Sequence, residues 1–361
     1  MITSIYTRST RHQRLGGVLL LLVGCLLFVP PVHGQSSTFE KAQTAYQFAE
    51  YEKAIDLFTQ VANSTSVSAE RKKQALRYLG RAYIARNKKG EAREAIRRLI
   101  KTEPPLVELN PNMEPPPVMN LYYEVRKEMN GYKVQKQRPG MQTLAVMDFS
   151  NNSIDQRERF QGLSKGLPAM MINYLNQGTD LKVIERERIE WLLNELKLQQ
   201  KEGIVDQSTA VRTGKLLGAN AVVFGSYTVF EDRMMIQARV VKVETGEILL
   251  GEQVMGKPDE FYTLIEDLSM EITRSLNVAV KEQKMGGSDT KSLDAMMAYS
   301  DGLNLLEDGK YRAAYEKFLQ AAEYDKSFKR AKIKAKSLRP LLVAQAEVQD
   351  KGTVPSSNMN R

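Results

Sequence analysis

The spacing of the apolar positions changes twice along the chain. In residues 35–103, and again in 290–348, apolar side chains recur at every third or fourth position, the period of one buried helix face. In residues 142–280, short apolar runs of strand length alternate with amphipathic helices. The pattern predicts an α/β plus all-α fold, in which a mixed β-sheet covered by helices is flanked by helical hairpins.

The central region contains the elements of a single sheet. Ile236, Ala238 and Val240 alternate with polar residues along one strand. The other strands are expected at 143–149, 181–186, 221–230 and 248–254. Helices are expected at 160–176, 189–196, 208–217 and 261–276. Two β-α units followed by a meander and a closing helix predict a mixed sheet with helices packed on it.

The two helical regions carry an internal repeat. The segments "EYEKAIDLFTQVA" and "YLGRAYIARNKKGEAREAIRRLI" match when Ala54 is aligned with Ala92, and small residues at these positions let helices cross closely. The segment "AYSDGLNLLEDGKYRAAYEKFLQAAEYD" has the same spacing near the C-terminus. Both regions resemble tetratricopeptide repeats, and ordinary helical hairpins are the alternative. Because one repeat cannot bury its own face, the last should pack on the central region or on residues 327–348.

Two segments break the periodic pattern. Residues 104–117 hold six of the thirteen prolines, so we expect 104–141 to be a Pro-rich linker with a short helix at 118–129. The polar residues 349–361 are expected to form a disordered tail.

Residues 1–34 have the features of a secretory signal peptide. Three arginines precede an apolar run at 15–29, and cleavage after Gly34 would make Gln35 the first residue of the mature chain. Cys25 follows Leu-Val-Gly and resembles an acylated lipobox cysteine, which would anchor the protein to a membrane as a lipoprotein. We favour cleavage at Gly34 because the apolar run continues past Cys25. An uncleaved N-terminal anchor is a further alternative.

The same segment limits the chemistry of the mature chain. The single cysteine and both histidines lie in residues 1–34, so cleavage leaves no disulfide, no Cys or His metal site and no Ser-His dyad. Phosphate-binding and dinucleotide-binding glycine motifs are also missing from the sequence. We therefore predict no enzymatic activity, no cofactor and no metal.

The net charge of +9 raises the question of an anionic partner. The basic residues lie on helical faces without interleaved aromatic residues, and export makes a nucleic acid partner improbable, so we predict none. Solvated helix surface is the favoured interpretation. Contact with anionic lipid head groups, peptidoglycan or acidic proteins is the alternative.

One pair of carboxylates is a weak candidate for chemistry. Asp148 ends the first predicted strand, where α/β sheets often bind ligands, and Asp155 follows it. Nothing else gathers near them in the sequence, so a surface or capping role is predicted. The segment 162–166, "GLSKG", is interpreted as scaffold.

The central region resembles a known family. The segment "VIERERIEWLLNELKLQQKEGIVDQSTAVRTGKLLGANAVVFGSYTVF", followed by "ARVVKVETGEILLGEQV", is similar to the CsgG family over about 142–280. Its namesake is the outer-membrane curli secretion component, and related folds occur in the TolB N-terminal domain, in FlgO and in activators of penicillin-binding proteins. The family motif maps onto residues that we expect to shape the fold: Glu185, Arg186, Gly218, Ala219, Gly225, Thr245 and Gly246.

The resemblance implies a non-enzymatic scaffold or accessory protein of outer-membrane assembly or secretion, in the periplasm or as an outer-membrane lipoprotein. Its partners would be envelope or outer-membrane proteins bound through the helical repeats, and a homo-oligomer is an open alternative. The namesake has two membrane-crossing hairpins, where this chain has only residues 231–235 and 255–258, so we expect no pore of its own. The alternative function is a periplasmic regulator that activates a peptidoglycan synthase or a flagellar or outer-membrane factor.

Overall fold

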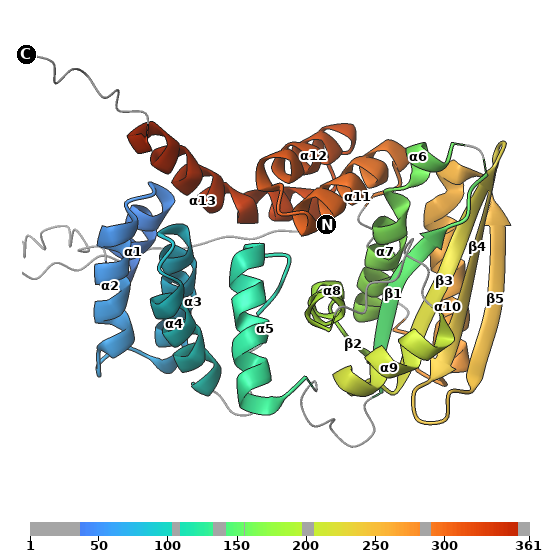
Figure 1. The fold of residues 1–361 in the computed structure, drawn as a ribbon, viewed down its shortest axis with the longest axis horizontal. Helices are drawn as coiled ribbons and strands as arrows, with labels where there is room; N and C mark the ends of the chain where they lie inside the picture. The colour runs from blue at the N-terminus through green and yellow to red at the C-terminus, as the bar shows by residue number, and fades with distance from the viewer. Residues whose placement is uncertain are drawn as a thin grey trace, which may run out of the picture. The chain divides into compact units, whose positions relative to one another are not determined.

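The computed structural model describes residues 37–102, 109–132, 142–154, 156–196, 206–281 and 290–352, with side chains up to 343. These residues belong to one compact unit, Ser37–Arg361. Asp155 and the predicted processing sites Cys25, Gly34 and Gln35 lie outside the described residues. Figure 1 labels the helices and strands.

The N-terminal helices share one apolar core. They are α1 (Thr38–Gln47), α2 (Tyr51–Asn63), α3 (Ala69–Ala85), α4 (Lys89–Lys101) and α5 (Pro116–Asn130). Each packs on the next, as Figure 1 shows. Ala54 and Ala92 are fully buried, and a side chain at Gly80 would start 3.3 Å from Ile96 Cγ1. The close helix crossings predicted from the small residues are therefore present, whereas the repeat family itself stays a prediction.

The short helix expected at 118–129 within the Pro-rich segment 104–141 is present as α5, and it begins two residues earlier than expected. Helix α5 begins at Pro116 and buries Leu121, Tyr122 and Val125 in the same core as α1–α4. Proline fits the first turn of a helix, where the backbone N–H groups have no intrahelical partner. The prolines at 115–117 thus start a structural helix, and they do not space two domains apart.

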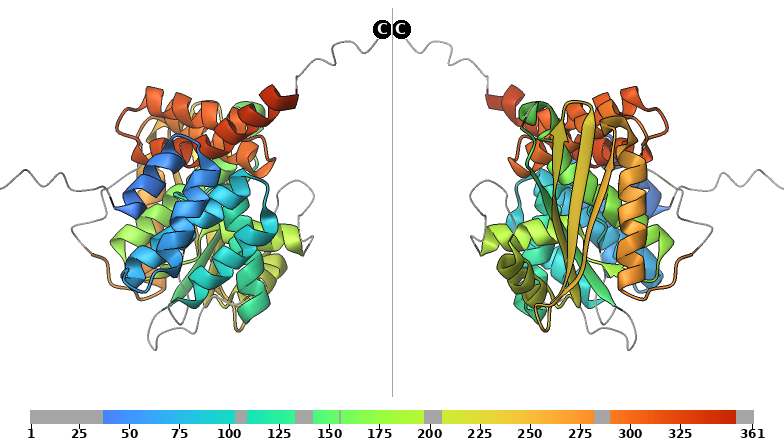
Figure 2. Two further views of the ribbon diagram at one scale, coloured as in Figure 1. Left: turned by 90° about the vertical axis from the view of Figure 1, so that its left-hand side faces the viewer. Right: turned by 90° about the vertical axis from the view of Figure 1, so that its right-hand side faces the viewer.

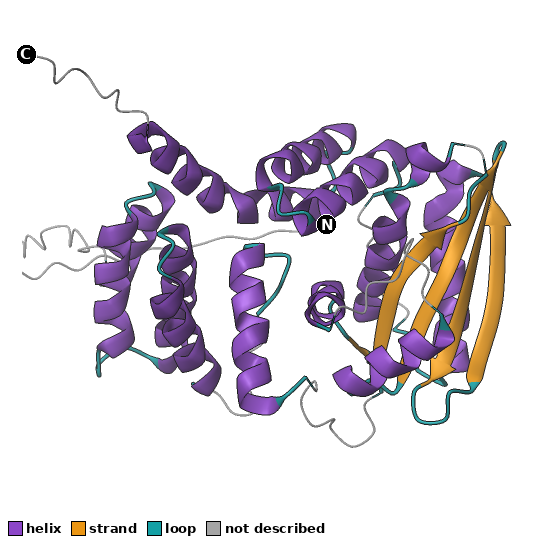
Figure 3. Ribbon diagram, viewed as in Figure 1, coloured by secondary structure: helices purple, strands orange, loops and turns teal. Residues whose placement is uncertain are grey.

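The central domain is built on a five-stranded mixed sheet, which Figure 3 shows in orange. Its strands are β1 (Thr143–Asn151), β2 (Lys182–Val183), β3 (Ala221–Phe230), β4 (Arg233–Lys242) and β5 (Ile248–Gly256), in the order β2-β1-β3-β4-β5. Strand β1 is parallel to β2 and β3, and β3, β4 and β5 form an antiparallel meander. The predicted mixed sheet is confirmed. The second strand is shorter than expected because helix α8 already begins at Arg186.

Helices cover both faces of this sheet. Helices α7 (Leu163–Gly178) and α10 (Phe261–Ser275) pack on one face, and α8 (Arg186–Glu195) and α9 (Gln207–Leu217) on the other. Figure 2 shows the sheet between them. The short helices α6 (Arg157–Phe160) and η2 (Pro258–Glu260) complete the domain. Along β1, Leu144 and Val146 point to the first face, and Ala145 and Met147 to the second.

The C-terminal helices extend the core of the α7–α10 face. They are α11 (Leu293–Glu307), α12 (Tyr311–Tyr324) and α13 (Lys329–Gly352). Helix α11 packs on α7, and α12 packs on α11 and α13, so the two alternatives expected for this hairpin, the central region or residues 327–348, both occur. The ring of Phe318 lies over Gly302, where an added Cβ would be only 2.6 Å from it.

Helix α13 differs from the prediction at its end. It runs to Gly352, beyond the expected start of the tail at 349, because the residues before that glycine are mostly good helix formers. It also reaches the N-terminal helices, since Tyr51 Oη donates a hydrogen bond to the Pro340 carbonyl over 2.9 Å. Within the described ranges, all helices are too short or too polar to cross a membrane.

We predict that Ala92→Leu destabilises the protein by about 1–3 kcal/mol, because α4 has no room for a larger side chain at its crossing with the neighbouring helices. Chemical denaturation of the purified protein measures this free energy. The control is Glu91→Leu, which introduces the same side chain at the adjacent, exposed position. Equal stability of the two variants would show that Ala92 does not lie at a tight crossing.

Candidate functional site

Asp148 lies in the carboxyl-terminal half of β1, three residues before the strand ends at Asn151. The pairing of β1 with the parallel strand β3 shifts between Val146 and Phe149, and Asp148 lies within this irregularity. In sheets with parallel strands, this end commonly holds ligands and reactive groups. The side chain is mostly buried, with 19% of its surface exposed. The predicted surface or capping role of Asp148 is therefore wrong.

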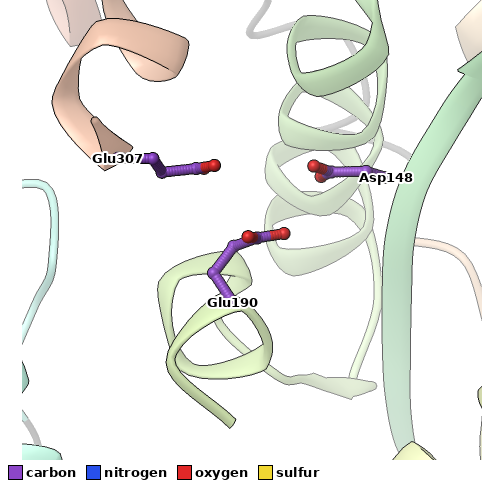
Figure 4. A group of neighbouring side chains, drawn as sticks. All are labelled: Asp148, Glu190 and Glu307. Atoms are coloured by element: carbon purple, nitrogen blue, oxygen red, sulfur yellow. The ribbon is translucent and has the colours of Figure 1, made fainter. Parts of the chain in front are cut away.

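Four charged side chains surround Asp148. Lys165 Nζ lies 2.8 Å from Asp148 Oδ2 and 2.5 Å from Glu307 Oε2. Arg186 Nη1 lies 2.6 Å from Glu307 Oε1 and 3.6 Å from Asp148 Oδ1. Glu190 completes the group, and Figure 4 shows the three carboxyl groups pointing toward one another. We call these five residues the charge cluster.

The charge cluster joins elements that are distant in sequence. Lys165 comes from α7, Arg186 and Glu190 lie one turn apart on α8, and Glu307 is the last residue of α11. The Arg186 side chain is only 4% exposed, so its charge depends on protein partners. The cluster therefore fastens the C-terminal helices to the central domain by charge-assisted contacts.

Mutual attraction stabilises the charged forms of three members. Burial favours the neutral form of Lys165 and Arg186, but the nearby carboxylates outweigh it and raise the pKa of both cations. Burial likewise opposes ionisation of Asp148, yet Lys165 and Arg186 hold the pKa of that carboxyl below its usual range. The three residues therefore remain charged at neutral pH.

Glu190 behaves differently from the other two acids. Its nearest cation among the described ion pairs is Arg186, at 3.9 Å. Burial, followed by the negative charge of Asp148, raises the pKa of Glu190 to about 8. At neutral pH Glu190 is thus mainly protonated. The two cations then balance the charges of Asp148 and Glu307.

A metal ion is a poor fit to the charge cluster. Oxygen atoms of Asp148, Glu190 and Glu307 lie within 4.8 Å of one another, which by itself suits a hard cation. The ammonium group of Lys165, however, already contacts both Asp148 and Glu307. A divalent ion would have to displace it and add positive charge beside Arg186. The chemistry of this donor set favours an ion-pair joint.

A second buried ion pair involves Glu187, the residue that follows Arg186. Lys334 Nζ on α13 is 2.6 Å from Glu187 Oε1 on α8 and donates a hydrogen bond to the Pro111 carbonyl over 3.1 Å. Although burial opposes it, Lys334 lowers the pKa of Glu187 to about 2. This contact ties α13 to the central domain and to the segment before α5.

A cavity of about 180 Å³ adjoins both sets of ion pairs. Its wall includes Met119 of α5, Glu190 and Trp191 of α8, Tyr311 of α12 and Lys334 of α13. The N-terminal helices, the central domain and the C-terminal helices all contribute to it. Cavities at such junctions are common places for ligands to bind.

The family-motif residues have structural surroundings and do not gather into one site. Gly218 ends α9 at φ 71°, and Gly246 takes φ 76° in the turn before β5, conformations that favour glycine. A Cβ at Gly225 would lie 2.1 Å from the Gln237 carbonyl oxygen across the sheet. Thr245 Oγ1 accepts a hydrogen bond from the Glu247 N–H.

The remaining motif residues lie near the two ends of the sheet's second face. Ala219 is buried just before β3. Glu185 directly precedes α8, and Arg186 is the motif residue that enters the charge cluster.

Sequence reasoning missed Lys165 and Glu307. Lys165 lies in the segment interpreted as scaffold, although a charged residue next to the buried Leu163, Gly166 and Leu167 could have indicated a buried partner. Glu307 ends a predicted repeat helix, and nothing in its neighbourhood distinguishes it from a surface acid. Only the fold places it beside Arg186, which is 121 positions away.

Comparison with known proteins agrees with this domain. Residues 127–235 match the family described as "Curli production assembly/transport component CsgG". The chain contains a CsgG-like domain. The match begins inside α5 and ends inside β4, whereas the sheet continues through β5. No curated protein matches the chain in sequence.

Three solved structures resemble parts of the chain. The LpoB C-terminal domain from Salmonella enterica is 15% identical over 32% of this chain and 82% of its own, with a TM-score of 0.24. TolB from Acinetobacter baumannii is 13% identical over 38% of this chain and 28% of its own, with a TM-score of 0.26. Lipoprotein GNA1162 from Neisseria meningitidis is 16% identical over 37% of this chain and 94% of its own, with a TM-score of 0.27.

We predict that Glu307→Gln lowers the free energy of unfolding by about 2 kcal/mol, because Lys165 and Arg186 lose the carboxylate that bridges them. Hydrogen exchange should also become faster in α11. The control is Asp308→Asn, which alters an exposed acid one position later and should stay within about 0.5 kcal/mol of the wild type. If the two variants behave alike, the charge cluster does not hold α11.

A second prediction concerns pH. A carboxyl whose pKa is about 8 in the fold and 4.5 as its reference value costs stability as the pH rises between these values. Glu190→Gln keeps the neutral form, so its stability relative to the wild type should increase from pH 5 to pH 8.5, by on the order of 4 kcal/mol.

Thermal melting of both proteins across this pH range measures the effect. Glu195→Gln on the same helix removes an exposed carboxyl, which pairs with Lys127, and is the matched control. Its stability relative to the wild type should change little with pH. If the stability of Glu190→Gln relative to the wild type also changes little with pH, Glu190 is ionised over the whole range.

Proposed function

We propose that the protein is a non-enzymatic scaffold of the cell envelope that assists outer-membrane assembly or the secretion of a surface polymer from the periplasm. The CsgG-like domain supports an accessory role in the envelope, because its family is described by curli production, assembly and transport. The predicted signal segment supports export, and the flanking helices supply surfaces for partner proteins.

This proposal rests mainly on the ion pairs that residues near the carboxyl end of β1 form with α7 and α11. In many α/β proteins this end of the sheet holds the ligand or the reactive groups. Here Asp148, three residues before the end of β1, pairs with Lys165, and Glu307 of α11 contacts the same cation. The part of the sheet where a ligand or reactive group would be expected thus connects the domain to the C-terminal helices by ion pairs.

The domain also presents an edge to possible partners. Among the described strands, β5 pairs only with β4, and Ile248 and Met255 along it are 46% and 52% exposed. The N-terminal helices expose Phe48, at 73%, in the turn between α1 and α2. Exposed apolar side chains at a free sheet edge and at a helix turn are typical of surfaces that contact other proteins.

Site-specific photo-crosslinking in intact cells tests the proposal. A photoreactive residue at Met255 or at Phe48 should yield adducts with proteins of outer-membrane assembly or secretion. The control is the exposed position Glu91 on α4, which carries a charged side chain in the wild type and should give fewer adducts.

The identity of the adducts decides between the functions. Reproducible adducts with peptidoglycan synthases would replace the proposal with the regulatory alternative. Adducts with cytoplasmic proteins, or equal labelling at all three positions, would overturn the scaffold role in the envelope.

A further inference from the structure

The cavity between the three parts of the chain has the size of a small-molecule site. Its volume is about 180 Å³, and a cavity of about 150 Å³ holds one benzene molecule. A nucleotide or a folded peptide is too large for it. A compound with a single short chain or ring fits.

One part of the wall is apolar and aromatic. Pro116 and Met119 of α5, Trp191 of α8, and Leu306 and Tyr311 of the C-terminal hairpin contribute to it. Trp191 is held in place by ring contacts with Tyr123 and Tyr132, at centroid distances of 5.7 and 6.1 Å. Aromatic rings beside a carboxyl group are the usual surroundings of bound ammonium and guanidinium groups.

Three of the four carboxyl groups in the charged part of the wall are closely paired with cations. Glu187 pairs with Lys334, and Glu307 with Arg186, each at 2.6 Å. Glu114 accepts hydrogen bonds from Arg77 and Arg81.

Glu190 has no cation this close among the described ion pairs, since Arg186 is 3.9 Å away, and its proton makes a hydrogen bond to the Asp148 carboxylate. Because Arg186 and Lys334 are both engaged, an anionic ligand finds no uncommitted cation in this wall.

We propose that this cavity binds a small organic cation, an alkylammonium or guanidinium compound, whose charge lies against the Glu190 carboxylate and whose carbon chain lies against Trp191. Such a ligand contacts α5, α8, α12 and α13 at once and so fastens the three parts of the chain together. The proposal does not depend on which envelope partner the protein has.

Binding is coupled to a proton. Burial and the neighbouring Asp148 keep Glu190 protonated at neutral pH, with a pKa of about 8. When the cation enters, Glu190 releases its proton to the solvent, and the positive ligand takes the place of that proton. The charge of the site is therefore unchanged. Affinity should rise about tenfold per pH unit well below this pKa and level off above it.

The single tryptophan of the chain provides the readout, because Trp191 itself lines the cavity. The purified protein is titrated with n-butylammonium and with methylguanidinium chloride at constant ionic strength, from pH 6 to pH 9. We expect a saturable change in fluorescence that strengthens about tenfold from pH 6 to pH 7. Calorimetry in two buffers of different ionisation enthalpy should show close to one proton released per ligand at pH 6.5.

Two variants and two further probes make the test specific. Glu190→Gln should abolish saturable binding, whereas Glu195→Gln, on the same helix but outside the cavity, should bind like the wild type. Neutral n-butanol should bind at least tenfold more weakly than n-butylammonium. Magnesium chloride should not reproduce the fluorescence change.

Equal binding of butanol, the same response to magnesium, or no saturable response at any pH would overturn the proposal. So would unchanged binding by folded Glu190→Gln. If that variant does not fold, the pH dependence and the proton release of the wild-type protein decide the question.

Discussion

The structure depends on keeping the charge of Arg186 paired in the interior. An unpaired guanidinium at this depth would cost several kcal/mol, so the fold must bring carboxylates to it. Asp148 from the sheet and Glu307 from α11 meet this requirement, and Lys165 balances them. Because these groups come from β1, α7, α8 and α11, satisfying one charge fixes how the C-terminal helices sit on the CsgG-like domain.

The sheet could be predicted from the sequence because its signals are local. Alternation at Ile236, Ala238 and Val240 indicates a strand with one buried face, and the structure buries all three. The helix face at Ile189 and Leu192 is equally visible. Linker and tail boundaries were less certain, since proline both favours extended chain and begins helices, as Pro116 does in α5.

The candidate site could be predicted only in part. Arg186 was found through the family motif, whereas its partner Glu307 is 121 positions away in a segment with ordinary surface composition. Likewise, Glu187 meets Lys334 across 147 positions. Such pairings cannot be predicted from the periodicity of the sequence. A single charged residue on a helix gives the same pattern whether it faces water or a buried partner.

The contacts of α13 have a consequence for the order of folding. Tyr51 and Lys334 reach Pro340 and Pro111 across 289 and 223 positions. Closing a loop of this length costs conformational entropy before the contact that it permits can stabilise the chain. Such contacts therefore tend to form late in folding. During synthesis the N-terminal helices emerge long before α13. The core shared by α1–α5 contains no residue of α13, so it can form first, and only the attachment of these helices to α13 must wait for the last helix.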